Sequence, residues 1–255
     1  CKEPITMRSD ASVYCMSEKE MENYEKCCGI LKKNMIHTGI PRHDKDWIEY
    51  VSKIKNTSED RLFDNYVFII GRPASPYNTL ERKLKALHDI NDIVCNKYKL
   101  KLVIKTHPKE SIDEGLYMEA FGMENYGKTW IYSDSHPFIL GKKSIFCITF
   151  YSGVIMDMLA INKPTIEYLD LKGLSEYDNS NALRDDDGNP VFQYRYTNLV
   201  LGASSKVEFE IHVDSILDNF EKVLSPLRSN YEELFFSSSE ASIKVADSIL
   251  KKISL

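Results

Sequence analysis

Between residues 66 and 170 the sequence alternates short apolar runs with longer segments that have helical spacing. Short apolar runs without polar alternation are typical of strands that are buried on both faces of a parallel sheet. The runs in this part of the chain are YVFIIG (66–71), KLVIKTHP (101–108), TWIYSD (129–134), SIFCITF (144–150) and PTIEYLD (164–170). Five strands that alternate with helices predict βαβ units. We therefore expect an α/β fold, with a Rossmann-like parallel sheet and helices on both of its faces.

The segments between these runs carry helical patterns. In 79–98 the apolar residues form one stripe, which consists of Leu80, Leu84, Leu87, Ile90 and Val94. We also predict a helix or partial helix in 110–122, a short helix in 135–143 and a helix in 152–162.

The pattern is less regular in the N-terminal part. There it predicts a strand at 12–16 and a helix at 17–28 that Ser17 caps, with Glu20 in the capping-box position. It then predicts, in order, a strand in 34–41, a helix in 43–56 and a polar linker at 56–60.

The C-terminal part begins with a polar, turn-rich segment at 172–196, in which Asp187-Gly188 predicts a tight turn. Helical spacing returns at 210–224 and at 230–252.

The composition is that of an ordinary globular protein: 43% of the 255 residues are hydrophobic and 28% are charged. The net charge of −5 argues against a nucleic-acid-binding protein, which would carry a basic excess. No apolar run approaches the ~18 residues of a transmembrane helix, and the first ten residues lack the apolar core of a signal peptide. Because the chain begins with Cys1 rather than Met, we expect a fragment of a longer protein.

The cysteines follow no metal-binding spacing, and several lie in apolar segments. They are Cys1, Cys15, Cys27, Cys28, Cys95 and Cys147. This usage predicts reduced thiols in a cytoplasmic protein.

Polar and small side chains follow the predicted strands at the points where those strands end. Open α/β sheets bind ligands at the carboxyl ends of their parallel strands, so we expect these side chains to converge on one edge. In strand order they are Arg72, Ser75 and Asn78; Lys105, Thr106, His107 and Pro108; Ser133, Asp134, Ser135 and His136; Tyr151, Ser152 and Gly153; and Glu167. Cations, hydroxyl groups and a helix N-terminus on one edge favour a phosphate-binding site.

The stretch KTHP (105–108) is the most specific of these features. Lys105 and His107 fall on the same face of the strand and Pro108 fixes the turn, so the imidazole is placed to donate to a phosphate oxygen. Ser152 can cap the following helix and offer its hydroxyl group, and Gly153 lets the backbone approach a ligand closely. A structural His107 and an ordinary N-cap at Ser152 remain as alternatives at this point.

Other chemistries find less support. In RDDDGNP (184–190), counting back from Gly188 places Leu183 at the first EF-hand ligand position, so we predict a solvated turn rather than a metal site. The chain has no Walker A loop, no GxGxxG and no GxSxG elbow, so it favours neither an ATPase, a dinucleotide enzyme nor a Ser-His-Asp hydrolase. We therefore predict no metal and no cofactor.

The stretch VIKTHP (103–108), followed by ITFYSGVIMDMLAINKPTIEY (148–168), resembles the C-terminal half of GT-B glycosyltransferases of bacterial capsule and lipopolysaccharide synthesis. The likeness is greatest to the capsular polysaccharide synthesis type, which includes Kdo transferases that use CMP-Kdo, and polysialyltransferases. CDP-glycerol glycerophosphotransferases of teichoic-acid synthesis share a similar His-Pro and Ser pattern. HTGIPRHDKDWIEY (37–50) is similar to the inter-domain segment of such enzymes, and the resemblance covers 35–225. The sequence departs from the family at 150–153, where many relatives have paired serines.

The resemblance implies a domain organisation. Residues 1–56 would be the end of an N-terminal, acceptor-side domain and the inter-domain segment. Residues 57–255 would be a Rossmann-like domain that binds the nucleotide-sugar donor, with its C-terminal helix packed back on the N-terminal part. Asp44 and Asp46 lie near the predicted hinge, where we expect a solvated helix start.

The resemblance also implies a function. The chain would belong to a cytoplasmic glycosyltransferase that moves a sugar acid such as Kdo from a CMP-linked donor. The acceptor would be a growing surface saccharide or its lipid-linked primer, at the inner face of the cytoplasmic membrane. The alternatives are a CDP-glycerol-type glycerophosphotransferase and a non-catalytic nucleotide-binding module. UDP-sugar 2-epimerases share the GT-B architecture and would need a pair of acid/base carboxylates.

By match to the family, His107 and Ser152 would contact the donor phosphate, and Glu167 would face the ribose or base. Lys105 and Arg72 would add positive charge. The rest of the predicted donor site consists of Asn78, Pro108, Ser133, Tyr151 and Gly153. We assign no catalytic base, because the acceptor site of these enzymes lies upstream of the part that this chain resembles.

Overall fold

The computed structural model describes residues 11–54, 62–110, 115–235 and 240–254. The chain divides into two compact units. The large unit is Ser52–Arg228, and the small unit combines Cys1–Val51 with Ser229–Leu255.

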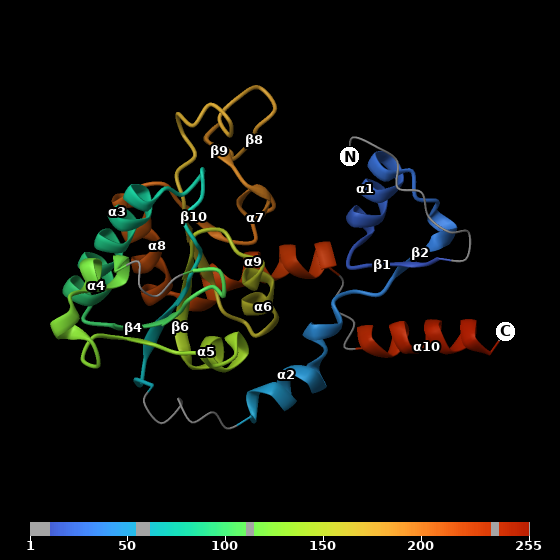
Figure 1. The fold of residues 1–255 in the computed structure, drawn as a ribbon, viewed down its shortest axis with the longest axis horizontal. Helices are drawn as coiled ribbons and strands as arrows, with labels where there is room; N and C mark the ends of the chain where they lie inside the picture. The colour runs from blue at the N-terminus through green and yellow to red at the C-terminus, as the bar shows by residue number, and fades with distance from the viewer. Residues whose placement is uncertain (1–10, 55–61, 111–114, 236–239, 255) are drawn as a thin grey trace. The chain divides into compact units, whose positions relative to one another are not determined.

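The large unit contains a parallel sheet that includes the labelled strands β4, β6 and β10 (Figure 1). The sheet has six strands in the order β10-β7-β6-β3-β4-β5. The strands are β3 (Tyr66–Ile70), β4 (Lys101–Lys105), β5 (Trp130–Tyr132), β6 (Ser144–Thr149), β7 (Thr165–Tyr168) and β10 (Leu201–Ala203). The predicted α/β fold is confirmed, and so are the five predicted strands. Strand β10 was not predicted, although its residues lie in the apolar run LVLGA (199–203).

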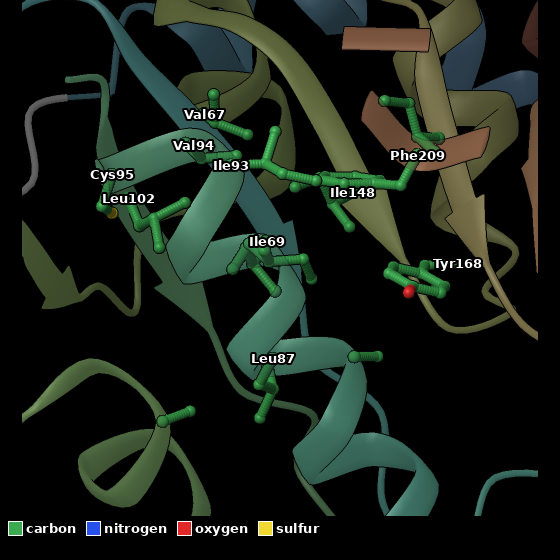
Figure 2. Close-up of a cluster of buried hydrophobic side chains, with 14 of the residues drawn as sticks. Val67, Ile69, Leu87, Ile93, Val94, Cys95, Leu102, Ile148, Tyr168 and Phe209 are labelled. Carbon is green, nitrogen blue, oxygen red and sulfur yellow. The ribbon is translucent and has the colours of Figure 1, made fainter. Parts of the chain in front are cut away.

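Helices cover both faces of this sheet. Helices α3 (Leu80–Ile90), α4 (Leu116–Phe121) and α8 (Lys206–Asp218) contribute to one hydrophobic cluster, and α5 (Pro137–Lys143) and α6 (Val154–Ala160) contribute to another. Successive residues of a strand serve the two clusters in turn: Val67 and Ile69 face α3, whereas Phe68 faces the α5 and α6 side. In Figure 2 Leu87, Ile93 and Val94 come from the α3 side and meet strand residues such as Ile69. The core is therefore two apolar layers with the sheet between them.

The predicted helix in 79–98 is present, but it changes form along its length. Thr79 caps α3, since its Oγ1 accepts the backbone N–H of Arg82 at 3.3 Å. The chain then continues as a π-helical segment, Asn91–Lys97. Ile93 and Val94 of this segment are buried in the same cluster as α3.

The turn-rich segment 172–196 contains a small hairpin of β8 (Leu183–Arg184) and β9 (Pro190–Val191), followed by α7 (Gln193–Tyr196). The predicted turn at Asp187-Gly188 is confirmed. Gly188 has a φ of 79°, and its N–H donates to the carbonyl of Asp185 at 2.9 Å.

The two helices predicted at 210–224 and 230–252 correspond to three helices in the structure, with different ends. Helix α8 starts at Lys206 because Ser205 caps it, a signal that was overlooked: Ser205 Oγ accepts the N–H of Glu208, and the Glu208 carboxylate accepts the N–H of Ser204. The predicted helix 210–224 is interrupted at Asn219, whose Oδ1 accepts the N–H of Lys222 at 3.0 Å and starts α9 (Phe220–Phe235). The predicted helix 230–252 is divided between α9 and α10 (Ala241–Ile253), and residues 236–239 lie outside the described residues.

The small unit contains β1 (Val13–Cys15) and β2 (Met35–His37), which pair in parallel. Its helices are α1 (Glu18–Cys28), α2 (Lys45–Ser52), the C-terminal part of α9 and the whole of α10. Short 3₁₀ turns lie at Lys32–Asn34 and Pro41–His43, and in the large unit at Met123–Asn125. The predicted cap of α1 is confirmed, because Ser17 Oγ accepts the N–H of Glu20 at 3.1 Å. The predicted linker at 56–60 lies outside the described residues.

One of the two carboxylates near the predicted hinge differs from expectation. Asp46 is exposed at the start of α2, as predicted, but Asp44 is buried. Its carboxylate accepts the backbone N–H groups of Ala241 at 2.9 Å and Ser242 at 2.8 Å. The prediction of a solvated Asp44 was therefore wrong, because this residue caps the N-terminus of α10.

Candidate functional site

Strands β3 and β6 lie side by side at the centre of the sheet, and the chain leaves them in opposite directions. From β3 it proceeds to β4 and β5, and from β6 to β7 and β10. The loops after β3 and β6 therefore diverge at this topological switch point, which is where open α/β sheets form a ligand-binding crevice. The predicted site residues follow β3, β4, β5 and β6 at this end of the sheet.

A row of residues, polar except for Ile70 at its centre, crosses the sheet at its carboxyl edge, on the face that α5 and α6 cover. Pairing of neighbouring strands places Ile70 beside Lys105 on one side and beside Thr149 on the other, and Thr149 beside Glu167. The row ends at Ser133, whose N–H donates to the carbonyl of Ile104 in β4. The structure thus brings the predicted Lys105, Ser133 and Glu167 into one row. Thr149 was not predicted.

His107 lies in the loop after β4, half-buried, with Pro108 exposed beside it. Its Nδ1 accepts the backbone N–H of Lys109 at 3.0 Å, so the proton of the neutral ring is on Nε2. Burial and the neighbouring charge of Arg72 lower the pKa of His107, which favours the neutral ring. The side chain therefore offers an N–H donor at Nε2.

Arg72 joins the loop after β3 to the loop after β6. Its Nε and Nη2 donate to the hydroxyl oxygen of Tyr77 at 3.1 and 2.8 Å, and its guanidinium lies 5.9 Å from the centre of the Tyr151 ring. Because its charge also acts on His107, the structure brings together the predicted residues Arg72, His107 and Tyr151.

Lys105 is half-buried next to this group. Its Nζ donates to the carbonyl of Asp134 at 3.0 Å, and burial lowers the pKa of its ammonium group. The side chain of Ser133 makes a local hydrogen bond, since its Oγ accepts the N–H of Ser135 at 3.3 Å. Of these two residues, Lys105 has the charge that an anionic ligand needs.

An aromatic cluster surrounds Tyr151, and sequence reasoning missed most of it. It consists of Tyr77, Tyr151, Tyr177, Phe192 and Tyr194, all half-buried, with ring centres 4.5 to 6.0 Å apart. Tyr77 and Tyr151 come from loops that are far apart in the sequence, and the other three residues come from the segment 172–196, so no local pattern could have joined them. The cluster contacts Arg72 in two ways. Tyr77 accepts hydrogen bonds from the guanidinium, and the ring of Tyr151 lies next to it.

The junction between β6 and α6 is built differently from the prediction in one respect. Ser152 is buried, and its Oγ accepts the N–H of Val154 at 3.3 Å, but the N-cap position of α6 is Gly153, which the side chain of Ser152 only precedes. Gly153 has a φ of −63°, and an added Cβ would have its closest contact at 3.4 Å, to Tyr194. The positive φ of this turn, 86°, belongs to Tyr151. The unusual backbone conformation therefore lies two residues before the glycine.

Glu167 has no exposed surface, because Arg195 covers it. The Nε of Arg195 lies 3.6 Å from Glu167 Oε1, and its Nη2 donates to the carbonyls of Glu167, Leu169 and Ala203. An added Cβ at Gly202 would lie 2.2 Å from the Arg195 Nε, so only glycine leaves room for this guanidinium. Glu167 is at the end of β7, as the sequence indicated, but its carboxylate is buried beneath Arg195.

Asn78 faces a separate cavity of about 220 Å³. The cavity is lined by Tyr77, Asn78, Arg82, Lys85, Ala86, Tyr168, Leu169, Asp170 and Ser204. Asn78 is 2% exposed, and its Nδ2 has no hydrogen-bond partner. Because Tyr77 both lines this cavity and bonds Arg72, the cavity is next to the cationic group, with the tyrosine between them.

Two further observations bear on function. In the part of the chain that the structure describes, no cluster of three or more His, Cys, Asp or Glu side chains could hold a metal ion. Within the same residues, no helix combines the length and the apolar character needed to cross a membrane.

Comparison with solved structures shows the fold. UDP-GlcNAc 2-epimerase of Methanocaldococcus jannaschii, in complex with UDP-GlcNAc and UDP, matches with a TM-score of 0.63 and 14% identity, over 94% of this chain and 61% of that one. The epimerase of Neisseria meningitidis bound to UDP-GlcNAc matches with a TM-score of 0.59 and 15% identity, over 93% and 61%. The wall teichoic acid polymerase TagF matches with a TM-score of 0.59 and 15% identity, over 95% and 58%.

These matches confirm the expected GT-B type of α/β fold, and at this identity they show the fold alone. The chain spans about 60% of the length of these structures. No protein-family model matches the chain, and no curated protein matches it. The narrower resemblance to CMP-Kdo transferases stays a prediction.

Proposed function

We propose that this chain contains the nucleotide-binding part of an enzyme that uses a nucleotide-activated donor. The crevice between the loops after β3 and β6 would hold the donor phosphate. The observation that carries the proposal is the arrangement of His107 and Arg72: a neutral imidazole with its N–H donor at Nε2 lies within electrostatic range of a guanidinium, in loops that follow neighbouring strands at the switch point of the sheet.

Each residue of this group has a role in the proposal. His107 donates a hydrogen bond to a phosphate oxygen through Nε2, and Arg72 supplies positive charge, with Lys105 as a second cation. These donors would stabilise the negative charge that develops on the phosphate when the donor bond breaks. The aromatic cluster around Tyr151 excludes water from one side of the crevice, which strengthens these interactions.

The donor in this proposal is CMP linked to a sugar acid such as Kdo, and the reaction is glycosyl transfer in the synthesis of a capsule or lipopolysaccharide. The acceptor is a surface saccharide or its lipid-linked primer, reached from the cytoplasmic face of the membrane. The motif resemblance of 103–108 and 148–168 supports this choice of donor. We assign no catalytic base to the chain.

A second candidate is a CDP-glycerol-type glycerophosphotransferase. The fold match to TagF favours it, because one matching TagF structure was soaked with CDPG. Both candidates place a cytidine nucleotide in the same crevice and differ in the group that is transferred. The epimerase alternative shares the fold, but Glu167, the carboxylate at the end of β7, is buried under Arg195 rather than open to a substrate.

Isothermal titration calorimetry with CMP, CDP, CDP-glycerol, CMP-sialic acid and UDP tests the proposal. The wild-type chain should bind a cytidine nucleotide, and His107→Ala should weaken that binding by about 10- to 100-fold, since a hydrogen bond to a charged group contributes about 1.5–3 kcal/mol. His88→Ala is the matched control, because His88 is an exposed histidine of α3 outside this group. Unchanged affinity in His107→Ala would remove His107 from the site, and the absence of nucleotide binding by the wild type would reject the proposal.

A further inference from the structure

A buried ion pair lies behind the His107 loop. Lys83 of α3 and Glu110 of the loop after β4 form a salt bridge, and both side chains are fully buried. Glu110 Oε1 also accepts the hydroxyl proton of Tyr117 at 2.8 Å, and the Lys83 Nζ lies 5.0 Å from the centre of the Tyr117 ring. The pair thus joins the end of β4 to α3 and α4.

The other oxygen of Glu110 reaches the backbone of His107. Oε2 accepts the His107 N–H at 3.0 Å, and the Glu110 N–H donates to the His107 carbonyl at 2.8 Å. These two bonds close a turn in which the N–H of Lys109 is directed at the imidazole Nδ1. Since the Lys109 bond sets which ring nitrogen carries the proton, the turn that Glu110 closes also determines where the His107 donor is.

The same carboxylate contacts the first residue of the other loop. An added Cβ at Gly71 would lie 2.4 Å from Glu110 Oε2 and 2.8 Å from the carbonyl oxygen of Lys105. The Gly71 N–H donates to that carbonyl at 2.8 Å. The carboxylate of Glu110 therefore bridges its own loop, which carries His107, and the loop that carries Arg72, and glycine at 71 makes the space for it.

Stability alone gives a weak reason for charges at this position. Removing a lysine and a glutamate from water has a large cost, and apolar residues of similar size often stabilise a core as well or better. An apolar residue at 110, however, could not accept the His107 N–H. The acceptor on Glu110 is what an apolar pair would lack.

We infer that Lys83 and Glu110 are positioning residues: the buried pair fixes the backbone and ring of His107 so that its Nε2 proton faces the crevice beside Arg72. This inference rests on the proposed function of the same crevice, since the phosphate is the ligand that the His107 donor would meet. The residues act through His107 and do not touch the ligand themselves.

Two double variants separate positioning from packing. Lys83→Met/Glu110→Leu replaces the pair by apolar side chains of similar size and removes the acceptor for the His107 N–H. Lys83→Met/Glu110→Gln removes the same charges and keeps an acceptor oxygen at 110. The control is Lys206→Met/Asp92→Asn, which removes an exposed ion pair of the same unit, 2.7 Å in length.

The first readout is the nitrogen-15 NMR spectrum of the His107 ring in the ligand-free protein, assigned by comparison with His107→Ala. The wild type and the Gln variant should show a single tautomer with the proton on Nε2. The Leu variant should show a mixture of the two tautomers. An unchanged tautomer in the Leu variant would overturn the inference.

The second readout is the calorimetric affinity for CMP and CDP. The Leu variant should bind about tenfold more weakly, and the Gln variant should recover most of that loss, because it restores the hydrogen bond. Equal affinity in the wild type and the Leu variant would overturn the inference. If the wild type binds neither nucleotide, the proposed function fails, and the tautomer measurement still decides the inference.

A third measurement covers the case in which the Leu variant does not fold. If circular dichroism shows that the Leu variant is unfolded, the Gln variant decides through the pKa of His107. Glu110 raises the pKa of His107 by its negative charge and accepts the His107 N–H through Oε2, whereas the Lys83 ammonium bonds Oε1 on the other side of the carboxylate. Removing both charges should therefore lower the pKa further. An unchanged pKa of His107 in the Gln variant would show that the two groups are not coupled, and would overturn the inference.

Discussion

The carboxyl group of Glu167 lies on β7 with no exposed surface, and the Arg195 Nε is 3.6 Å from it. Neither carboxylate oxygen has a hydrogen-bond donor, and the Oγ1 of Thr149 beside it also lacks a partner. Burial raises the pKa of Glu167 to about 7, although the charge of Arg195 acts in the opposite direction. The raised pKa of Glu167 therefore reflects the complete burial of its side chain at the end of β7.

This raised pKa predicts a pH-dependent stability. The folded-state pKa lies above the unfolded one, so the contribution of Glu167 is most favourable at low pH and is lost as the pH rises toward 7. Glu167→Gln removes this titration. Relative to the wild type, its free energy of unfolding should rise by about 2.5 kcal/mol between about pH 5 and about pH 8.

Urea denaturation of both proteins at several pH values measures this difference. The comparison uses the change with pH, so a constant effect of the substitution on the Arg195 contact cancels. A pH-independent difference between the two proteins would show that Glu167 titrates normally in the folded state.

At the scale of single residues, the sequence indicated the strand-end cations well and the loop aromatics poorly. Lys105 is the last residue of β4 and His107 follows two residues later, so a strand prediction was enough to place them at the edge of the sheet. Tyr177 and Phe192 lie in a turn-rich segment whose path no local pattern describes. Their contacts with Tyr77 depend on how that segment folds over the sheet.

Helix α10 shows how one element depends on a residue far away in the chain. Asp44 accepts the first two N–H groups of this helix, which otherwise have no partner within it. A carboxylate there also interacts favourably with the positive end of the helix dipole. The start of α10 is therefore set by a residue that lies almost 200 positions earlier in the sequence.

Asp44→Ala should lower the free energy of unfolding by about 2 kcal/mol, because the buried Ala241 N–H and the part-buried Ser242 N–H lose their acceptor. Asp46→Ala is the matched control, since Asp46 is exposed at the start of α2 and should change the stability by less than about 0.5 kcal/mol. Chemical denaturation followed by far-UV circular dichroism compares the two. Equal effects would mean that the Asp44 cap contributes nothing.

At the scale of elements, capping signals explain both the successes and the misses of the sequence analysis. The Ser17 and Glu20 pattern was recognised, and α1 begins where it predicts. The Ser205 and Glu208 pattern was overlooked, so α8 was predicted to begin four residues late. Strand β10 just before it was missed for a related reason: its apolar run has only five residues and no helix start was recognised after it.

The two units of the molecule differ greatly in their buried cores. In the large unit, β3, β4 and β6 are enclosed by apolar clusters on both faces. In the small unit, the apolar cluster at β1 and β2 consists of Cys15, Cys28, Ile30 and Met35 among the described residues. Because local stability depends on buried apolar contacts, the two sheets should open with very different free energies.

Hydrogen–deuterium exchange followed by mass spectrometry measures this difference. After correction for intrinsic rates, amides of β1 and β2 should exchange at least about 100-fold faster than those of β3, β4 and β6. The exposed C-terminal residues of α10 serve as an internal reference for fast exchange. Equal protection in the two sheets would show that the units unfold together as one cooperative structure.

The sequence by itself determined the alternation of strands and helices between 66 and 170 and the place of Lys105 and His107 at a strand end. These follow from local apolar spacing and capping residues, which act over a few positions of the chain. Only the tertiary structure decided that Arg195 buries Glu167, that Asp44 caps α10 and that the Glu110 carboxylate bridges two loops. These contacts join residues that are distant along the chain. They form only when the packed elements bring those residues within hydrogen-bonding or van der Waals distance.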